Sequence, residues 1–137
     1  MQTFKLSKTH RLVSILKDVT IKNIYVDVVK APVRGFEFGE VWGNAIGGII
    51  ISGTKENMIE NLALENIDAS LPGGVTEYEQ KEVLYMKDKY PEFHRMDIVP
   101  AKGIYIRDVK GYSLNNVNLT FKEDDVRETI VCENVLK

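Results

Sequence analysis

The feature that most constrains the fold of this 137-residue chain is a six-residue pattern that occurs four times. Each copy reads apolar, any, apolar, any, Asn, apolar. Alternating apolar residues predict a β-strand with one buried face, and the Asn then interrupts the alternation. Because Asn tolerates the left-handed backbone conformation, we expect each strand to turn a corner there and to continue with its next apolar side chain still inward. The four copies occupy residues 19–24, 62–67, 112–117 and 130–135.

The amino-acid composition favours strands over helices. The chain holds 15 Val and 13 Ile, against 10 Leu and 5 Ala. Residues branched at Cβ fit a strand better than a helix, whereas Ala and Leu favour helices. Ten Gly and nine Asn are enough to supply the turns between many short strands.

The spacing of the repeats predicts a solenoid. Asn23 and Asn66 are 43 residues apart, Asn66 and Asn116 are 50 apart, and Asn116 and Asn134 are 18 apart. If one coil takes about 18–25 residues, the first interval holds two coils and the last holds one. We therefore predict an all-β fold, a right-handed parallel β-helix fragment of about five coils that forms a single partial domain over residues 1–137. The coils between the repeats are expected near residues 36–46 and 103–106.

In such a β-helix, equivalent side chains stack from coil to coil. An inward Asn at each corner can hydrogen-bond to the next Asn and form a ladder along the axis. We therefore interpret the four Asn residues as structural. Cys132 occupies the position of Ile21 and Leu64 in the pattern, so we expect it to be a buried apolar filler. The residues predicted to point inward are Val19, Ile21, Leu62, Leu64, Leu114, Leu119, Ile130 and Cys132.

The 50-residue interval has room for an insertion, and the sequence predicts a short α-helix there, at about residues 76–90. Pro72, Gly73 and Gly74 break the strand pattern, and Thr76 with Glu79 forms a capping box. Good helix formers follow. Acidic residues in the first turn and Lys in the last suit the helix dipole, and a proline at position 91 ends the segment.

Composition also excludes several classes of function. The formal net charge of −2 gives no support for a nucleic-acid or membrane partner. A single cysteine and two histidines argue against a disulfide or a metal site, and we expect no cofactor. No apolar stretch approaches the roughly 20 residues that span a bilayer, and the first residues lack the apolar core of a signal peptide.

Several segments together resemble a known family. They are 50–54 (Ile-Ile-Ser-Gly-Thr), 59–67 (Ile-Glu-Asn-Leu-Ala-Leu-Glu-Asn-Ile), the Pro-Gly-Gly break, 89–92 (Lys-Tyr-Pro-Glu) and 100–107 (Pro-Ala-Lys-Gly-Ile-Tyr-Ile-Arg). In this order they are similar to the C-terminal coils of polygalacturonase-like proteins of glycoside hydrolase family 28, of the type found in Bacteroidetes. The resemblance covers roughly residues 15–137. It implies a parent protein that hydrolyses a pectin-type, galacturonate-containing polysaccharide and is secreted or periplasmic.

The catalytic motifs of that family are missing from the chain. It contains no Asn-Thr-Asp, Gly-His-Gly or Arg-x-Lys segment, and its one Asp-Asp pair is Asp124-Asp125. That pair lies in a charged run between two strands, so we expect a solvated turn. We therefore assign no catalytic residue and expect this chain to be the non-catalytic C-terminal portion of the parent hydrolase. The alternative is a stand-alone β-solenoid that binds carbohydrate or serves as a structural module.

Three residues are candidates for substrate binding. His94 and Arg95 follow the predicted helix, in a loop that flanks the sugar cleft in the family, and Arg fits a uronate carboxylate with two hydrogen bonds. Tyr105 alternates with inward Ile residues and could stack on a sugar from the outer face. An exposed polar loop and an ordinary exterior position are the simpler interpretations, and Trp42 is more simply a residue packed against a turn.

A β-helix with an open end also predicts self-association. Unpaired strand edges at such an end invite pairing with another chain. We expect residues 12–26, at the N-terminal open end, to form an intermolecular contact.

Overall fold

The structure is a computed structural model, and it describes residues 15–29, 48–85 and 98–137. The regular secondary structure of these residues consists of β-strands alone, which confirms the all-β prediction for this part of the chain. Every strand pair is parallel. The strands are β1 (Lys17–Asp27), β2 (Ile49–Ser52), β3 (Ile59–Gly73), β4 (Ala101–Glu123) and β5 (Glu128–Leu136).

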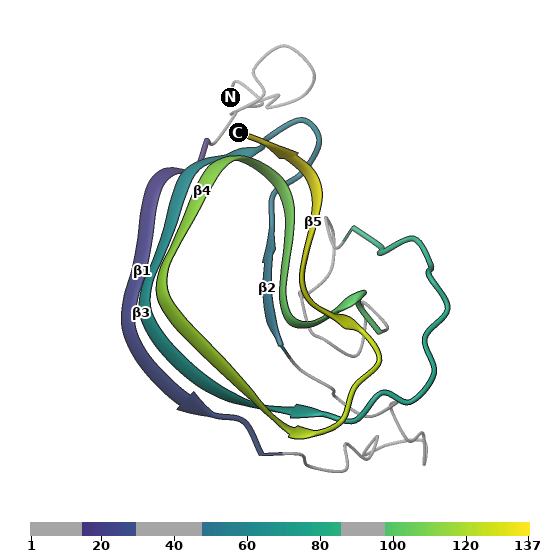
Figure 1. The fold of residues 1–137 in the computed structure, drawn as a ribbon. Helices are drawn as coiled ribbons and strands as arrows, with labels where there is room; N and C mark the ends of the chain where they lie inside the picture. Colours follow the sequence, from purple (N-terminus) through teal and green to yellow (C-terminus); the bar gives the residue numbers. More distant parts are fainter. Residues whose placement is uncertain (1–14, 30–47, 86–97) are drawn as a thin grey trace, which may run out of the picture.

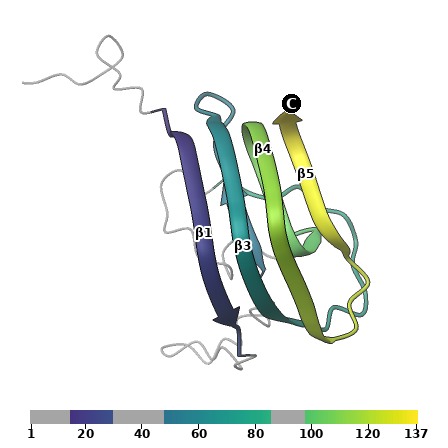
Figure 2. The same cartoon turned by 60° about the vertical axis from the view of Figure 1, so that its left-hand side comes forward.

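The strands belong to one curled sheet. β3 lies between β1 and the second half of β4, whereas β2 and β5 both pair with the first half of β4. Seen end-on, β1, β3 and the second half of β4 follow one curve, and β2, β5 and the first half of β4 face them across the interior (Figure 1). Figure 2 shows β1, β3, β4 and β5 side by side.

Apolar side chains at equivalent register positions stack through the sheet and form the core. Leu64 of β3 lies between Ile21 and Leu114, and both of its neighbours pack against the buried cluster. Burying an aliphatic side chain of this size stabilises the fold by about 1.5–3 kcal/mol. The predicted inward residues that lie in or against this core are Val19, Ile21, Leu62, Leu64, Leu114 and Leu119.

The last strand departs from the prediction. Ile130 and Cys132 are in register with the buried residues Ile104 and Ile106, but Ile130 is 39% exposed and Cys132 is exposed as well. No described strand covers the outer edge of β5, so its side chains lack neighbours on that side. The prediction that Cys132 is a buried filler is therefore wrong.

The Asn corners have the predicted left-handed conformation. Asn23, Asn66 and Asn116 have φ values of 59°, 51° and 53°. Nδ2 of Asn116 donates to Oδ1 of Asn66 at 2.8 Å, and Nδ2 of Asn66 donates to Oδ1 of Asn23 at 3.1 Å. These three residues form an Asn ladder as predicted, but their side chains are exposed, so the prediction that they point inward is wrong.

A second row of left-handed residues runs beside the first. Asp18 and Asn61 have positive φ values, as does Gly111, and each lies five residues before an Asn of the first row. Nδ2 of Asn61 donates to Oδ1 of Asp18 at 2.8 Å. Each strand on this side of the sheet therefore has two left-handed residues at which it can bend.

The predicted length of a coil is wrong. Asn66 bonds directly to Asn23 and to Asn116, so the intervals of 43 and 50 residues each bring the chain back to the neighbouring strand. Asn134 pairs instead with Asp108, on the opposite side of the curl. The estimate of about five coils fails because it assumed one short coil length, whereas long excursions separate the strands. Residues 103–106 belong to β4 itself, and residues 36–46 lie outside the described part.

The predicted helix is also absent over its described part, residues 76–85. A helix there would use the Val83 carbonyl to accept from the amide four residues later. Instead, the guanidinium of Arg107 donates to the carbonyls of Val83 and Leu84. Local helix propensity is a weak preference, and these tertiary contacts override it. Residues 86–90 lie outside the described ranges.

Candidate functional site

The outer face of β4 carries a polar cluster whose members from β4 itself are buried. Ile104 and Ile106 point into the core, so the alternating residues Tyr105 and Arg107 point the other way. The segment after β3 crosses this face, and its Val83 packs with Val99 against the Tyr105 ring. We call Tyr85, Tyr105, Arg107, Asp108 and Glu133 the outer cluster.

Arg107 fastens the crossing segment to the sheet. Only 1% of the residue is exposed. Its Nε donates to Oγ of Ser52 at 3.0 Å, and Nη1 and Nη2 donate to the carbonyls of Val83 and Leu84 at 2.6 and 3.2 Å. The Tyr85 ring lies 3.8 Å from the guanidinium carbon, at cation–π distance. A buried guanidinium with this many partners is typical of a structural anchor.

Asp108 is fully buried at a corner of β4. It has a left-handed φ of 54°, as Asn has at the other corners. Its Oδ2 accepts from the Tyr85 hydroxyl at 2.6 Å, and its Oδ1 accepts from Nδ2 of Asn134 at 2.6 Å. Both carboxylate oxygens are therefore held by protein donors.

The two tyrosines of the outer cluster are held as neutral proton donors. Burial and the hydrogen bond to Asp108 raise the pKa of Tyr85 to about 12. Burial and the hydrogen bond to Glu133 raise the pKa of Tyr105 above its ordinary range. Neither phenol can act as a base near neutral pH, because each stays protonated there.

Two carboxylates of the outer cluster lie on neighbouring strands, as the paired carboxylates of a glycosidase could. Asp108 and Glu133 come from β4 and β5, and both lie beside Arg107 in the register. Asp108 has no exposed surface, however, and Glu133 accepts from the Tyr105 hydroxyl. With one carboxylate sealed away from solvent, the pair cannot act on the two sides of a scissile bond.

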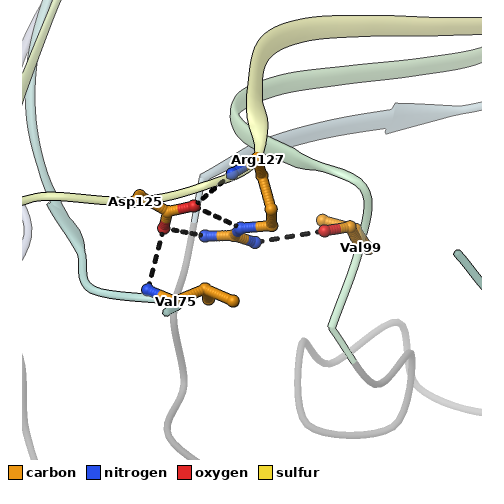
Figure 3. Close-up of polar contacts among 4 residues, drawn as sticks. All are labelled: Val75, Val99, Asp125 and Arg127. Carbon is orange, nitrogen blue, oxygen red and sulfur yellow. Dashed lines mark hydrogen bonds and ion pairs between the residues drawn. The ribbon is translucent and has the colours of Figure 1, made fainter. Parts of the chain in front are cut away.

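A solvated turn was predicted for the Asp124-Asp125 pair; Asp124 is exposed, but Asp125 has a different environment (Figure 3). Asp125 is not solvated: its side chain is 0% exposed and forms an ion pair with Arg127 at 2.7 Å. Oδ2 of Asp125 also accepts from the Val75 amide at 3.2 Å, and Arg127 donates to the Val99 carbonyl at 3.1 Å. The Asp125–Arg127 ion pair therefore joins the two ends of the excursion between β3 and β4, residues 74–100, to each other.

Opposing effects set the acidity of Asp125. Burial by itself would raise its pKa. Hydrogen bonds from the Arg127 side chain and from the amides of Arg127 and Val75 outweigh burial, and they lower the pKa below its ordinary value of 3.8. Asp125 is consequently ionised throughout the physiological range and is a poor proton donor.

The predicted binding residues are not brought together in the described part. His94, Arg95 and Trp42 lie outside the described residues, so their roles stay predictions. Tyr105 points to the outer face as expected, but it is only 1% exposed. The crossing segment would have to move before a sugar could reach its ring.

Sequence reasoning missed four members of the outer cluster, namely Tyr85, Arg107, Asp108 and Glu133. A signal for Asp108 was present: Asp shares with Asn the tolerance of left-handed backbone, and Asp108 interrupts an apolar alternation as the Asn corners do. No comparable signal marked Tyr85, which joins the cluster from 23 residues away.

In the described residues no group of three or more His, Cys, Asp or Glu side chains is arranged to hold a metal ion. The same residues include no helix that is long and apolar enough to span a bilayer.

The chain was also compared with known proteins. No protein-family model matches it, and no curated protein or solved structure does so either.

Proposed function

We propose that the chain is a stretch of right-handed parallel β-helix that serves as a non-catalytic part of a polygalacturonase-like hydrolase, secreted or periplasmic, acting on pectin-type polysaccharide. The observation that supports this architecture is that the left-handed corners of neighbouring strands are aligned. Left-handed residues of β1, β3 and β4 lie directly beside one another, so successive strands bend at the same places. Such bends repeated in register produce the stacked coils of a solenoid.

The polar groups of the described residues support a structural role. Inverting hydrolysis needs an acid and a base about 6.5–9.5 Å apart on either side of the scissile bond. Asp108 and Asp125 are buried and hydrogen-bonded, and Asp124 is the exposed neighbour of a residue committed to an ion pair. These contacts hold the excursion against the sheet, and Asp108, Asp124 and Asp125 do not provide an acid–base pair.

The choice of substrate rests on the resemblance of residues 15–137 to glycoside hydrolase family 28. Arg95 and His94 are the residues proposed to contact a uronate, and the excursion that carries them is fastened at residues 75, 83 and 84. Sugar binding needs only part of a cleft, so weak binding can persist without hydrolysis.

A reducing-end assay on polygalacturonate and rhamnogalacturonan tests the absence of catalysis. The purified chain should release no reducing ends above background. Turnover that Asp124→Asn or Asp125→Asn abolishes would contradict the proposal. The pH optimum of any turnover would then identify the acid involved.

Titration with oligogalacturonides tests the substrate class. Arg95→Ala and His94→Ala should each weaken binding, with Lys137→Ala as a control for the loss of an exposed positive charge. The coding sequence upstream of Met1 should carry the Asn-Thr-Asp and Gly-His-Gly segments in frame. No binding together with no such segments would instead favour the stand-alone structural solenoid.

A further inference from the structure

The Asn ladder has a direction. At each step the Asn nearer β4 donates from Nδ2 to Oδ1 of the Asn nearer β1. The last residue of the row is Asn23, whose own Nδ2 donates to no residue that the structure describes. A strand on the outer side of β1 would complete the row if it brought an acceptor to this position.

The outer edge of β1 is open among the described residues. β1 pairs with β3 on one side, and no described strand pairs with the other. Ile24 of β1 is 40% exposed, whereas its neighbour Ile67 in β3 is 3% exposed. Unpaired amides and carbonyls beside a half-exposed apolar row are a template for another strand.

The opposite end of the sheet offers a matching edge. β5 covers β4 only as far as Lys110, which pairs with Leu136. From Gly111 to Phe121, no described strand pairs with the edge of β4 away from β3. The acceptor Oδ1 of Asn116 lies on this edge, and its one described donor is Nδ2 of Asn118, at a long 3.5 Å.

We propose that these two edges bind each other, so that β1 of one copy pairs in parallel with residues 111–121 of a second copy. The corners fit: Asp18 and Asn23 are five residues apart, as are Gly111 and Asn116, and all four have positive φ. In this register Asn23 donates to Asn116 of the second copy and continues the ladder in its existing direction. Asp18 has no donor to offer, and Gly111 has no side chain that would need one.

The side chains in this register are compatible. Ile21 would lie beside Leu114 and Ile24 beside Val117, the combinations already stacked through β3 within one chain. On the outer face Lys22 would meet Asn115, and Asp27 would meet Thr120, so each charge faces a neutral residue. No like charges repel across the contact between residues 18 and 27.

The facing side of the curl supplies a second contact. β2 and β5 pair with opposite edges of β4, so each keeps one edge without a described partner. Stacking two copies brings these edges together, with Ile49 beside Ile130, since both align with Ile104. This contact would cover Ile130, which is exposed in the single chain.

The chain ends impose one adjustment. Lys17 and Leu136 both align with Lys110 through the sheet, so they would compete for one place in the stack. Residues 15–17 of one copy, or 136–137 of the other, must turn aside. The contact therefore begins at Asp18.

This association joins two different surfaces, so it does not close on itself as a twofold dimer does. Each copy keeps one free edge of each kind, and the assembly grows in a line with concentration. The inference goes beyond the proposed function and does not depend on it, because it requires only the curled parallel sheet.

Sedimentation velocity with two single variants tests the contact. The wild-type chain should form a concentration-dependent series of oligomers. Ile24→Lys blocks the β1 edge and Val117→Lys blocks the β4 edge, so each variant alone should be monomeric. Mixed in equal amounts they should form a heterodimer and nothing larger, because one intact edge of each kind remains. Far-UV circular dichroism checks that both variants are folded.

A milder variant tests the ladder bond without disturbing the single chain. Asn23→Asp keeps the acceptor for Asn66 and tolerates the left-handed corner, but it loses the Nδ2 donor. The dissociation constant should rise about tenfold. Thr20→Asp adds the same charge to β1 away from the corner and should change the constant less than about threefold.

Three outcomes would overturn the inference. The first is a wild-type chain that stays monomeric at all concentrations. The second is association that Ile24→Lys abolishes and Val117→Lys leaves unchanged, which indicates a β1–β1 contact. The third is a mixture of the two variants that remains monomeric although both are folded.

Discussion

At the scale of single residues, left-handed backbone is confined to side chains that tolerate it. All seven non-glycine residues with positive φ in the described ranges are Asn or Asp. A short polar side chain can hydrogen-bond locally and reduces the cost of this conformation, which is about 1–2 kcal/mol for other residues. The corners are therefore the positions where a substitution acts on backbone and hydrogen bonds together.

Asn66 is the most demanding of these corners, because it both donates and accepts in the ladder. Asn66→Ala should lower the free energy of unfolding by about 2–4 kcal/mol, from the left-handed strain and two lost hydrogen bonds. Asn66→Gly removes the strain and should recover about half of this loss. Urea denaturation measures both, and a glycine variant as stable as the wild type would show that the ladder contributes nothing.

Asp125 and Asp124 form a matched pair of adjacent carboxylates with opposite environments. Asp125→Asn leaves the buried Arg127 without its counter-ion and should cost about 3–5 kcal/mol of stability. Asp124→Asn, on the exposed neighbour, should stay within about 0.5 kcal/mol. Equal effects of the two substitutions on the denaturation midpoint would contradict the ion pair.

The pKa of Asp125 also predicts how stability depends on pH. Its pKa is lowered in the folded state, so the ion pair contributes fully above the unfolded value of 3.8. The contribution is lost as pH falls through the lower folded pKa. The stability difference between the wild type and Asp125→Asn should therefore be constant from pH 5 to 7 and shrink below about pH 4. A difference that grows on acidification would have the wrong sign.

At the scale of elements, the crossing segment after β3 is held by side chains rather than by regular backbone pairing. Arg107 binds the carbonyls of Val83 and Leu84, and Asp125 binds the Val75 amide. These few contacts replace the repeated hydrogen bonds that a helix would have supplied. The segment should therefore depend on individual residues in a way that the strands do not.

Arg107→Lys tests this dependence. Lysine keeps the charge, but it lacks the planar guanidinium that reaches the two carbonyls and Ser52 at once. Proteolysis within residues 80–85 should become at least tenfold faster, while the amides of β3 keep their hydrogen-exchange protection. Tyr85→Phe, which removes only the bond to Asp108, should have a smaller effect. Unchanged proteolysis in Arg107→Lys would show that apolar packing of Val83 alone holds the segment.

At the scale of the whole molecule, the sheet is buried in the middle and open at its ends. β3 has described neighbours on both sides, whereas β1 and β5 each have one. The side chains of β1 that pack against the core are accordingly only partly buried. Stability should fall from the centre of the sheet toward both ends.

Hydrogen exchange can measure this gradient. Amides of β3 should exchange slowest, and those of β1 and β5 faster, when the protein is dilute. If copies stack as inferred, protection of β1 and of residues 111–121 should rise together with concentration. Rates in β1 that are independent of concentration, in a sample that does associate, would locate the contact elsewhere.

The strands and corners were accessible from sequence because they rest on local rules. Alternation with a period of two identifies a strand that is buried on one face, and an Asn that interrupts the alternation indicates a left-handed bend. Six of the eight residues predicted to be inward lie in or against the core for this reason. The left-handed corners at Asn23, Asn66 and Asn116 followed from the same pattern, but the direct bonds between them did not, because further coils were expected in between.

The remaining features depended on contacts between distant parts of the chain. The segment at 76–85 carries helix-forming residues, yet Arg107 of another strand takes the carbonyls that a helix needs. The sequence predicts Asp125 in a solvated charged turn. In the structure the ends of the excursion, Val75 and Val99, bind the Asp125–Arg127 pair, and the Asp125 side chain is buried. The number of coils was misjudged because spacing along the chain does not reveal which strands pair.

By itself the sequence determined where the chain extends and where it bends, since each is a preference of a few neighbouring residues. Only the tertiary structure decided which strands meet and which charges are buried, because those depend on groups that folding alone brings together.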